Sequence, residues 1–339
     1  MDTLRFGMIG AGAISNAHVP SIKGIDGAEI VCIADINLDQ ARARAEQWGA
    51  ERAVASYDEL IGMDDIDAIV IGIPTQFHAD AAIKAAKAGK HVLCEKPMAR
   101  TLEDCRAMMA AHEQAGTTLG IGFVRRFDPN WGIVRSLVHE GRAGHPCMWR
   151  RIIVGAAPGP PNYGEWYSQS KFSDGPLTES ASHDVDFLLY TFGDVANVTA
   201  HMEHVGPNGD VLDNCIVILQ FVNGDRALLQ WSWCLPRGAT AGFRGMDVIG
   251  PDGCIHEPRQ DGEQWVVDVS KPDGTETIPF ENERNAETWS MGQMNDFIAA
   301  IREGRPTRAT GDDGYKAQEV YLAAVRSMEE GRRIDLPLE

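Results

Sequence analysis

Short, largely apolar runs alternate with helix-forming segments over the first third of the chain. Leu4–Ile9, Ala28–Ala34 and Ala68–Ile73 have the length of strands, and glycine, aspartate or proline follows each of them. Ala79–Ala88 is rich in alanine and lysine and ends at Gly89, a common helix stop. This alternation predicts a parallel sheet covered by helices.

The pattern changes after Phe123. One helix, near Asn130–Glu140, is followed by strands with no helix between them, and the Asn-Gly and Asp-Gly turns that separate them are typical of antiparallel pairs. Two helices, Ala286–Glu303 and Gly314–Glu330, end the chain. The expected strands are Cys147–Val154, Val195–His204, Asn214–Phe221, Arg226–Trp233, Phe243–Ile249 and Gln264–Val269. We therefore predict an α/β fold in two domains: residues 1–123 with a parallel sheet, and residues 124–339 with a large, mostly antiparallel open sheet.

Two tryptophans suggest what the second sheet does. Trp231 and Trp233 alternate with polar residues, so one face of their strand would be aromatic. A sheet covered by one helix layer leaves its other face free, and a broad apolar face usually meets a partner. We expect a homodimer or homotetramer joined through this sheet. The alternative is that both tryptophans face helices of their own subunit.

A glycine-rich turn follows the first strand. The sequence Gly10-Ala11-Gly12-Ala13-Ile14-Ser15 matches the dinucleotide-binding fingerprint, with Ser15 at the third glycine position. Gly10 permits the tight turn, and Gly12 lets a pyrophosphate approach the backbone. The helix after them offers its N–H groups and positive dipole end. This predicts a Rossmann domain in which Gly10, Gly12, Ala13 and Ile14 contact the cofactor.

Asp35 ends the second strand, 25 residues after Gly10. A carboxylate there accepts hydrogen bonds from the adenosine ribose and repels a 2′-phosphate. No arginine follows it immediately. We therefore expect NAD as the cofactor rather than NADP. The alternative is that Asp35 only caps the helix that begins near Leu38.

Lys96 follows the strand His91–Cys94 in the run Glu95-Lys96-Pro97, where the proline stops the strand. Ligands bind at the carboxyl ends of the strands in open parallel sheets. Lys96 is then a cation and proton donor directed at a ligand, although a surface lysine in a loop would have the same local sequence.

Composition narrows the class of protein. The net charge of −18 argues against nucleic-acid binding, and no run of about 20 apolar residues could span a membrane. The chain starts almost directly with a strand, which leaves no room for a signal peptide. Seven cysteines without a Cys-x-x-Cys pair fit the cytoplasm. Histidines and cysteines lie scattered without ligand spacing, so we expect no metal site.

Motifs along nearly the whole chain resemble the glucose–fructose oxidoreductase / inositol dehydrogenase / rhizopine catabolism protein (Gfo/Idh/MocA) family. They are the glycine turn, Pro74-Thr-Gln-Phe-His78, Gly89 to Pro97, Arg125 to Pro129, and Glu179-Ser-Ala-Ser-His183-Asp-Val-Asp186. The resemblance implies a Rossmann domain, an α/β domain with a large open sheet, and nicotinamide-dependent redox chemistry on sugars, cyclitols or related alcohols.

The resemblance also implies residue roles. Lys96 matches the lysine of the family's Glu-Lys-Pro motif, and we expect it to hydrogen-bond the reacting oxygen. His183 matches the motif's histidine and is the expected general base. Glu179 stands where many relatives have aspartate, and we expect it to be a catalytic and substrate-contacting carboxylate. Whether it orients the substrate or the catalytic pair stays open. Pro74, His78, Glu95 and Lys96 are expected beside the cofactor, with a purely structural role open for His78 and Glu95.

Substrate contacts are less clearly marked. Arg126 could bind hydroxyls or a carboxylate, or could instead bridge the two domains. The Pro/Gly-rich loop with Tyr163 and Trp166 offers aromatic and polar groups suited to a sugar.

Three functions are compatible with these residues. The first is an NAD-dependent dehydrogenase acting on a secondary hydroxyl of a sugar or cyclitol. The second is a redox-assisted glycosidase that oxidises a hydroxyl, eliminates the aglycone and restores the hydride. The third is a non-catalytic NAD-binding sensor, against which the presence of both Lys96 and His183 argues.

Overall fold

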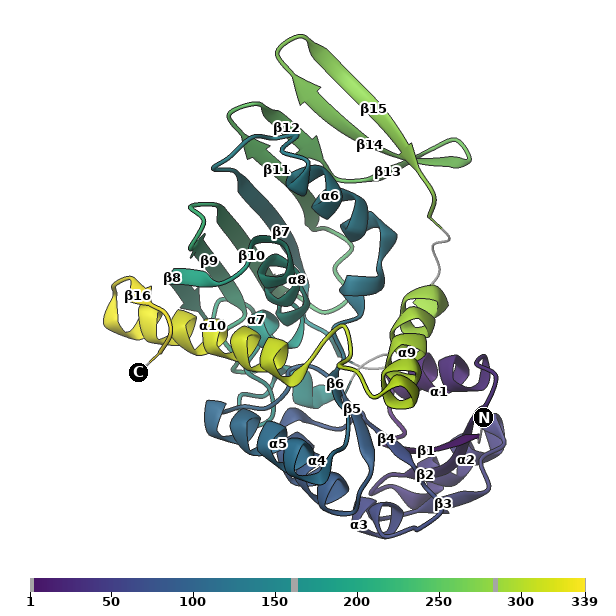
Figure 1. The fold of residues 1–339 in the computed structure, drawn as a ribbon. Coiled ribbons are helices and arrows are strands. Elements are labelled where there is room, and N and C mark those ends of the chain that lie inside the picture. Colours follow the sequence, from purple (N-terminus) through teal and green to yellow (C-terminus); the bar gives the residue numbers. More distant parts are fainter. Residues whose placement is uncertain (1–2, 160–163, 283–285, 339) are drawn as a thin grey trace. The chain divides into compact units, whose positions relative to one another are not determined.

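The computed structural model describes residues 3–159, 164–282 and 286–338, which form two compact units (Figure 1). The first unit comprises Met1–Phe127 and Asn285–Gln318, and the second comprises Asp128–Arg284 and Glu319–Glu339. The boundary expected between residues 123 and 124 differs from this division in two respects. The first unit continues to Phe127. Residues 285–318 return to the first unit, because α9 (Ala286–Glu303) packs on α1 (Ser15–Lys23).

The first unit is a Rossmann domain, as expected. Its six parallel strands follow the order β3-β2-β1-β4-β5-β6, and helices connect them. Its further elements are β1 (Leu4–Ile9), β2 (Ala28–Ala34), α2 (Leu38–Trp48), β3 (Arg52–Val54), α3 (Tyr57–Ile61), β4 (Ala68–Ile71), η1 (Thr75–Phe77), α4 (His78–Lys87), β5 (His91–Cys94), α5 (Leu102–Ala115), β6 (Leu119–Ile121) and η2 (Val124–Phe127). The helix α10 (Gly311–Glu330) starts in this unit and ends in the second.

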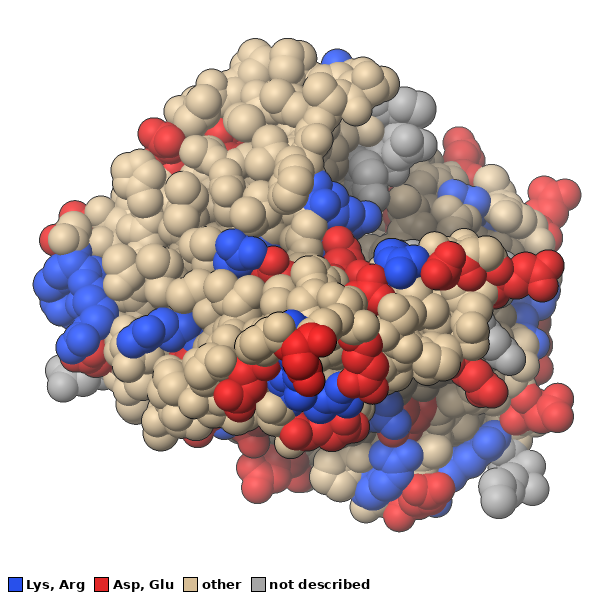
Figure 2. All heavy atoms as spheres, turned by 90° about the horizontal axis from the view of Figure 1, so that it is seen from above, with Lys and Arg blue, Asp and Glu red and all other residues tan. Residues whose placement is uncertain are grey.

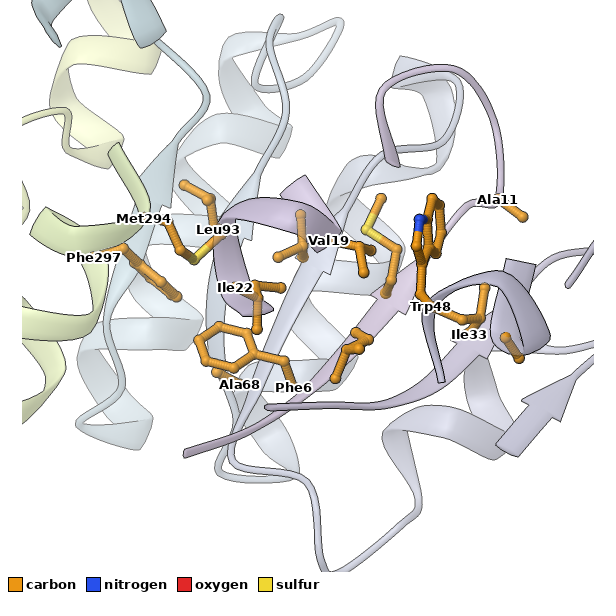
Figure 3. Close-up of a cluster of buried hydrophobic side chains, with 14 of the residues drawn as sticks. Phe6, Ala11, Val19, Ile22, Ile33, Trp48, Ala68, Leu93, Met294 and Phe297 are labelled. Atoms are coloured by element: carbon orange, nitrogen blue, oxygen red, sulfur yellow. The ribbon is translucent and has the colours of Figure 1, made fainter. Parts of the chain in front are cut away.

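A buried apolar cluster explains why α9 belongs to this unit. Met294 and Phe297 of α9 lie with Ile22 of α1, Phe6 of β1 and Leu93 of β5 (Figure 3). Phe6 and Phe297 have ring centroids 6.4 Å apart. Removing this much apolar surface from water is the main stabilising term in such a core, so a segment almost 300 residues downstream completes the N-terminal core.

The second unit contains one large mixed sheet. Its strands run in the order β13-β14-β12-β11-β7-β10-β9-β8-β16, with β15 paired to β14. Its elements are α6 (Pro129–His139), β7 (Met148–Ala156), η3 (Glu165–Ser168), α7 (Pro176–Glu179), α8 (Ser182–Phe192), β8 (Val195–Glu203), β9 (Asn214–Phe221), β10 (Arg226–Leu235), β11 (Phe243–Gly250), β12 (Gly253–His256), β13 (Arg259–Asp261), β14 (Gln264–Lys271), β15 (Gly274–Phe280) and β16 (Ile334–Asp335). The mostly antiparallel sheet is confirmed, and β7 with β10 forms its parallel pair among the described strands.

The expectation that strands follow one another without helices is wrong between β7 and β8, where α7 and α8 intervene. The reason is the composition of α8. Its residues Val185, Phe187, Leu188 and Phe192 are all buried, together with Asp184 and Asp186, so apolar residues do not follow one stripe. A helix buried on several sides lacks the periodic pattern that makes a helix recognisable.

The expectation that Trp231 and Trp233 form a free face is also wrong. They are 6% and 4% exposed. Trp231 donates a hydrogen bond from Nε1 to Asp184 of α8 at 2.5 Å, and Trp233 packs with Ala157 and Tyr167. The tryptophan face is therefore covered by the chain itself, and the opposite face of the strands is the more exposed one.

Charge is spread over the surface. On the face shown in Figure 2, acidic and basic side chains lie interspersed, and acidic residues outnumber basic ones 49 to 31 in the sequence. Among the described residues, no helix is long and apolar enough to cross a membrane. All seven cysteines are free thiols.

Candidate functional site

The glycine turn after β1 has the backbone that its sequence predicts. Gly10 has a φ of +101°, and a Cβ there would overlap the carbonyl oxygen of Gly72 at the end of β4. Gly12 differs, because a Cβ at this position would meet no atom within 4 Å. Gly10 is thus required by the fold, whereas Gly12 borders open space.

Asp35 lies beside this turn. One carboxylate oxygen accepts the N–H of Ala11 at 2.8 Å, and the other accepts the N–H of Asn37 at 2.8 Å. The cap of α2 is Asn37, whose side chain accepts from the N–H of Gln40. The alternative that Asp35 itself caps this helix is therefore wrong, and its carboxylate is tied to the glycine turn.

These features fit a dinucleotide. Ala13 and Ile14 are exposed next to Gly12, and no side chain caps the start of α1. A helix start of this kind attracts phosphate oxygens. The open space at Gly12, the uncapped helix and the carboxylate at the end of β2 provide the parts that a pyrophosphate and a ribose require.

At the end of β5, Glu95 is buried and bonded on both oxygens. One oxygen lies 2.7 Å from Nε2 of His18, and the other accepts the main-chain N–H of Lys96 at 3.1 Å. Gly122 leaves room for this carboxylate, because a Cβ there would lie 2.9 Å from its carbon. Burial opposes ionisation, but the hydrogen bond from His18 and the charge of Lys96 together hold the pKa of Glu95 below its usual value. Lys96, half-buried, thus follows an ionised carboxylate.

His78 connects two loops of the first unit. Its ring nitrogens lie 2.7 Å from the carbonyl oxygen of Ile73 and 3.0 Å from that of Pro97. The side chain is 1% exposed, and this burial lowers its pKa. His78 therefore fixes the loop containing half-buried Pro74 against the loop that carries Lys96.

The guanidinium of Arg126 has two partners in its own unit. Its guanidinium pairs with Asp313 at 2.8 Å and donates to the carbonyl oxygen of Arg308 at 2.5 Å. Burial opposes ionisation of Asp313, yet the charge and hydrogen bond of Arg126 hold the pKa of this carboxyl below its usual value. These contacts tie η2 to the start of α10.

In the second unit, Glu179 and His183 flank a break between two helices. Glu179 is the last residue of α7 and is 5% exposed, whereas His183 is the second residue of α8 and is half-buried. Their spacing of four residues spans the break at Ser180–Ala181.

A buried charge network that the sequence did not reveal lies directly after His183. Asp184 is 0% exposed, accepts from Nε1 of Trp231, and has an oxygen 3.9 Å from Nε of Arg151. Arg151 also pairs with Glu257 at 3.1 Å and lies over the ring of Trp131. Burial lowers the pKa of Arg151. The start of α8 is thereby held to β7 and β10.

The aromatic loop is described in part. Trp166, half-buried on η3, has its ring centroid 4.0 Å from that of Tyr167. Tyr167 in turn contacts Trp233, with centroids 6.3 Å apart. Tyr163 lies outside the described residues.

The strand order and the glycine turn define the class of the first unit: a dinucleotide-binding Rossmann domain. A family model described as an oxidoreductase family with an NAD-binding Rossmann fold matches residues 4–123, and the corresponding C-terminal alpha/beta domain matches residues 135–336. The chain belongs to the Gfo/Idh/MocA oxidoreductase family, and the resemblance seen in the sequence is confirmed.

Several relatives match over nearly their whole length. The chain is 31% identical to myo-inositol 2-dehydrogenase of Thermotoga maritima, over 98% of each chain. It is 32% identical to inositol 2-dehydrogenase of Rhizobium meliloti, over 98% of this chain and 99% of that one. Among solved structures, levoglucosan dehydrogenase in complex with NADH matches with a TM-score of 0.85 and 25% identity, over 100% of both chains.

Proposed function

We propose that the protein oxidises a secondary hydroxyl of a sugar or cyclitol, with NAD as the hydride acceptor. The observation that carries the proposal is the end of β5, where Lys96 follows an ionised, buried carboxylate in the same unit as the glycine turn. The relatives named above, two inositol dehydrogenases and a levoglucosan dehydrogenase, act on this class of polyol.

Proton handling is assigned to side chains of this chain. We propose that Lys96 donates a hydrogen bond to the reacting oxygen and stabilises negative charge on it. His183 accepts the hydroxyl proton as general base, since a neutral imidazole is basic enough near neutral pH. Glu95 accepts the main-chain N–H of Lys96 and so positions this residue. Bound NAD supplies the hydride acceptor.

The cofactor is proposed to lie along the glycine turn, with its pyrophosphate at Gly12, Ala13 and Ile14 and its adenosine ribose at Asp35. Gly10 shapes this turn. At the other end of the cofactor we propose Pro74, Glu95 and Lys96, with His78 fixing their loops through the bonds to Ile73 and Pro97.

Substrate contacts are proposed for Glu179, Trp166 and Tyr163 in addition to Lys96 and His183. Glu179 is a buried carboxylate able to accept hydrogen bonds from hydroxyls, and the aromatic rings offer faces for a sugar ring. Arg126 was also expected here. Because Asp313 and Arg308 engage its guanidinium, we propose instead that it anchors η2.

We further propose a homodimer or homotetramer located in the cytoplasm. The exposed face of the large sheet presents Ile216, Ile218 and Phe243, which are 37%, 44% and 56% exposed. Apolar residues clustered on a sheet face usually meet a partner. Light scattering at micromolar concentration should give at least twice the mass of the chain, and a monomer would contradict the proposal.

The function is tested by incubating the protein with NAD and a panel of free monosaccharides, cyclitols and aryl glycosides while following NADH and released aglycone together. We expect stoichiometric NADH from a free polyol. Aglycone release without net NADH would instead indicate a redox-assisted glycosidase. Binding of NAD with neither product would favour a sensor.

A further inference from the structure

Three potential metal ligands meet at the start of the parallel strand pair of the second unit. They are His145 and Cys147, just before β7, and Asp225, just before β10. Their ligand atoms, a nitrogen, a sulfur and an oxygen, all lie within 4.8 Å of one another. Sequence spacing could not reveal this group, because Asp225 lies 78 residues from Cys147.

The carboxylate at the centre is firmly oriented. Asp225 is 1% exposed, and it accepts the main-chain N–H of Cys147 at 2.7 Å and the side-chain amide of Asn223 at 2.9 Å. Nδ1 of His145 lies 3.0 Å from both carboxylate oxygens. Outer hydrogen bonds of this kind are what hold ligating carboxylates in place in metal sites.

We propose that His145, Cys147 and Asp225 bind a divalent transition-metal ion of the zinc type. One nitrogen, one sulfur and one oxygen ligand form a donor set that zinc accepts in tetrahedral geometry. The side chain of His145 is half exposed, so it can adjust to the ion and leave a fourth position to water. None of the three ligands is a residue to which the proposed function gives a role.

Binding requires the thiolate of Cys147. Burial, followed by the charge of Asp225, raises the pKa of this thiol to about 12. A bound cation reverses that effect, because a coordinating thiol loses its proton outright. The Cys147 thiol proton is released to solvent, and the metal–sulfur bond forms.

The ion would stabilise the fold rather than take part in catalysis. Arg226 pairs with Met148 in the parallel register, and its N–H donates to the carbonyl oxygen of Cys147 at 2.9 Å. A metal shared by Cys147 and Asp225 would join the residues immediately before these two strands, adding its binding free energy to the stability of the folded state.

The test is titration of the metal-free, untagged protein with cobalt(II) chloride while recording the near-ultraviolet absorbance. We expect one equivalent of cobalt to produce a thiolate-to-cobalt charge-transfer band, and zinc to abolish it by displacement. Cys147→Ser should remove the band. His145→Ala, which changes a half-exposed side chain and leaves the core intact, should weaken cobalt binding by about tenfold or more.

A second histidine–aspartate pair supplies the matched control. Nδ1 of His204 lies 3.2 Å from a carboxylate oxygen of Asp213, and Cys215 follows Asp213 by two residues in the sequence. His204→Ala should leave the cobalt band and its affinity unchanged. The proposal would be overturned if the wild-type protein showed no band, if the band survived Cys147→Ser, or if His145→Ala bound cobalt as tightly as the wild type.

Discussion

The glycine turn of the first unit and the start of α8 in the second both carry proposed functional residues, but these residues are held in place in different ways. The turn depends on backbone shape: Gly10 adopts a positive φ, and Gly12 borders open space. The start of α8 depends on side chains from distant strands, since Asp184 is held by Trp231 and lies near Arg151. Backbone sites are encoded by neighbouring residues, whereas side-chain sites require the completed core.

The largest effect should come from removing either proposed proton-handling group, Lys96 of the first unit or His183 at the start of α8. Lys96→Ala and His183→Ala should each lower turnover by a factor of about 100 to 10,000, because each removes acid–base or charge-stabilising work from the transition state. Steady-state kinetics on the substrate found in the panel measures this. NAD should still bind both variants, since neither change alters the glycine turn.

Exposed residues of the same types provide the controls. Lys87→Ala on α4 and His201→Ala on β8 should retain wild-type turnover. Wild-type turnover in His183→Ala would remove this histidine from the mechanism and leave Lys96 as the sole proposed proton-handling group.

Disrupting the buried network of Asp184, Trp231 and Arg151 should lower the stability of the fold more than it lowers catalytic turnover. Asp184→Ala removes the acceptor for Trp231 and a counter-charge near buried Arg151, so the free energy of unfolding should fall by about 3 kcal/mol. Asp184→Asn keeps an acceptor and should cost less. Denaturant unfolding measures both changes.

An exposed aspartate gives the comparison for this effect. Asp261→Asn interrupts a surface ion pair with Arg259 and should leave the unfolding midpoint almost unchanged. Equal stability of Asp184→Ala and the wild type would mean that the buried network does not support the start of α8.

The difference between the two regions also explains what the sequence could predict. The Rossmann strands and the turn at Gly10 follow from local patterns, and the structure has the strands Leu4–Ile9, Ala28–Ala34 and His91–Cys94 at the expected residues. Asp35 could be placed beside the turn because its spacing from Gly10 is fixed by one βαβ unit.

The features that the sequence could not predict depend on contacts between segments that are far apart in the chain. The burial of Trp231 depends on α8, a helix whose buried aspartates hide its periodicity. The pairing of Arg126 with Asp313 joins segments almost 190 residues apart, which no local pattern reveals. Similarly, α9 completes the first core only because the chain returns to it after β7 to β15 of the second sheet.

The smallest predicted effect belongs to a substitution in the glycine turn, and it tests most directly whether the backbone there approaches the cofactor. Gly12→Ala adds a methyl group to open space, so the free energy of unfolding should change by no more than about 0.5 kcal/mol. The same methyl group would occupy the place proposed for the pyrophosphate, and NAD should bind about tenfold more weakly, which is about 1.4 kcal/mol. Titration calorimetry with NAD and thermal unfolding without it separate the two quantities.

Gly10→Ala is the matched variant, because it adds the same methyl group two residues earlier. There the methyl would overlap the carbonyl oxygen of Gly72 at a φ of +101°, so the unfolding free energy should fall by about 2 kcal/mol even without cofactor. Loss of stability with Gly12→Ala, or unchanged NAD affinity, would show that the open space beside Gly12 is not where the cofactor approaches the backbone. Because both variants differ from the wild type by one methyl group, any difference between them reports the local backbone and its surroundings rather than the chemistry of the substitution.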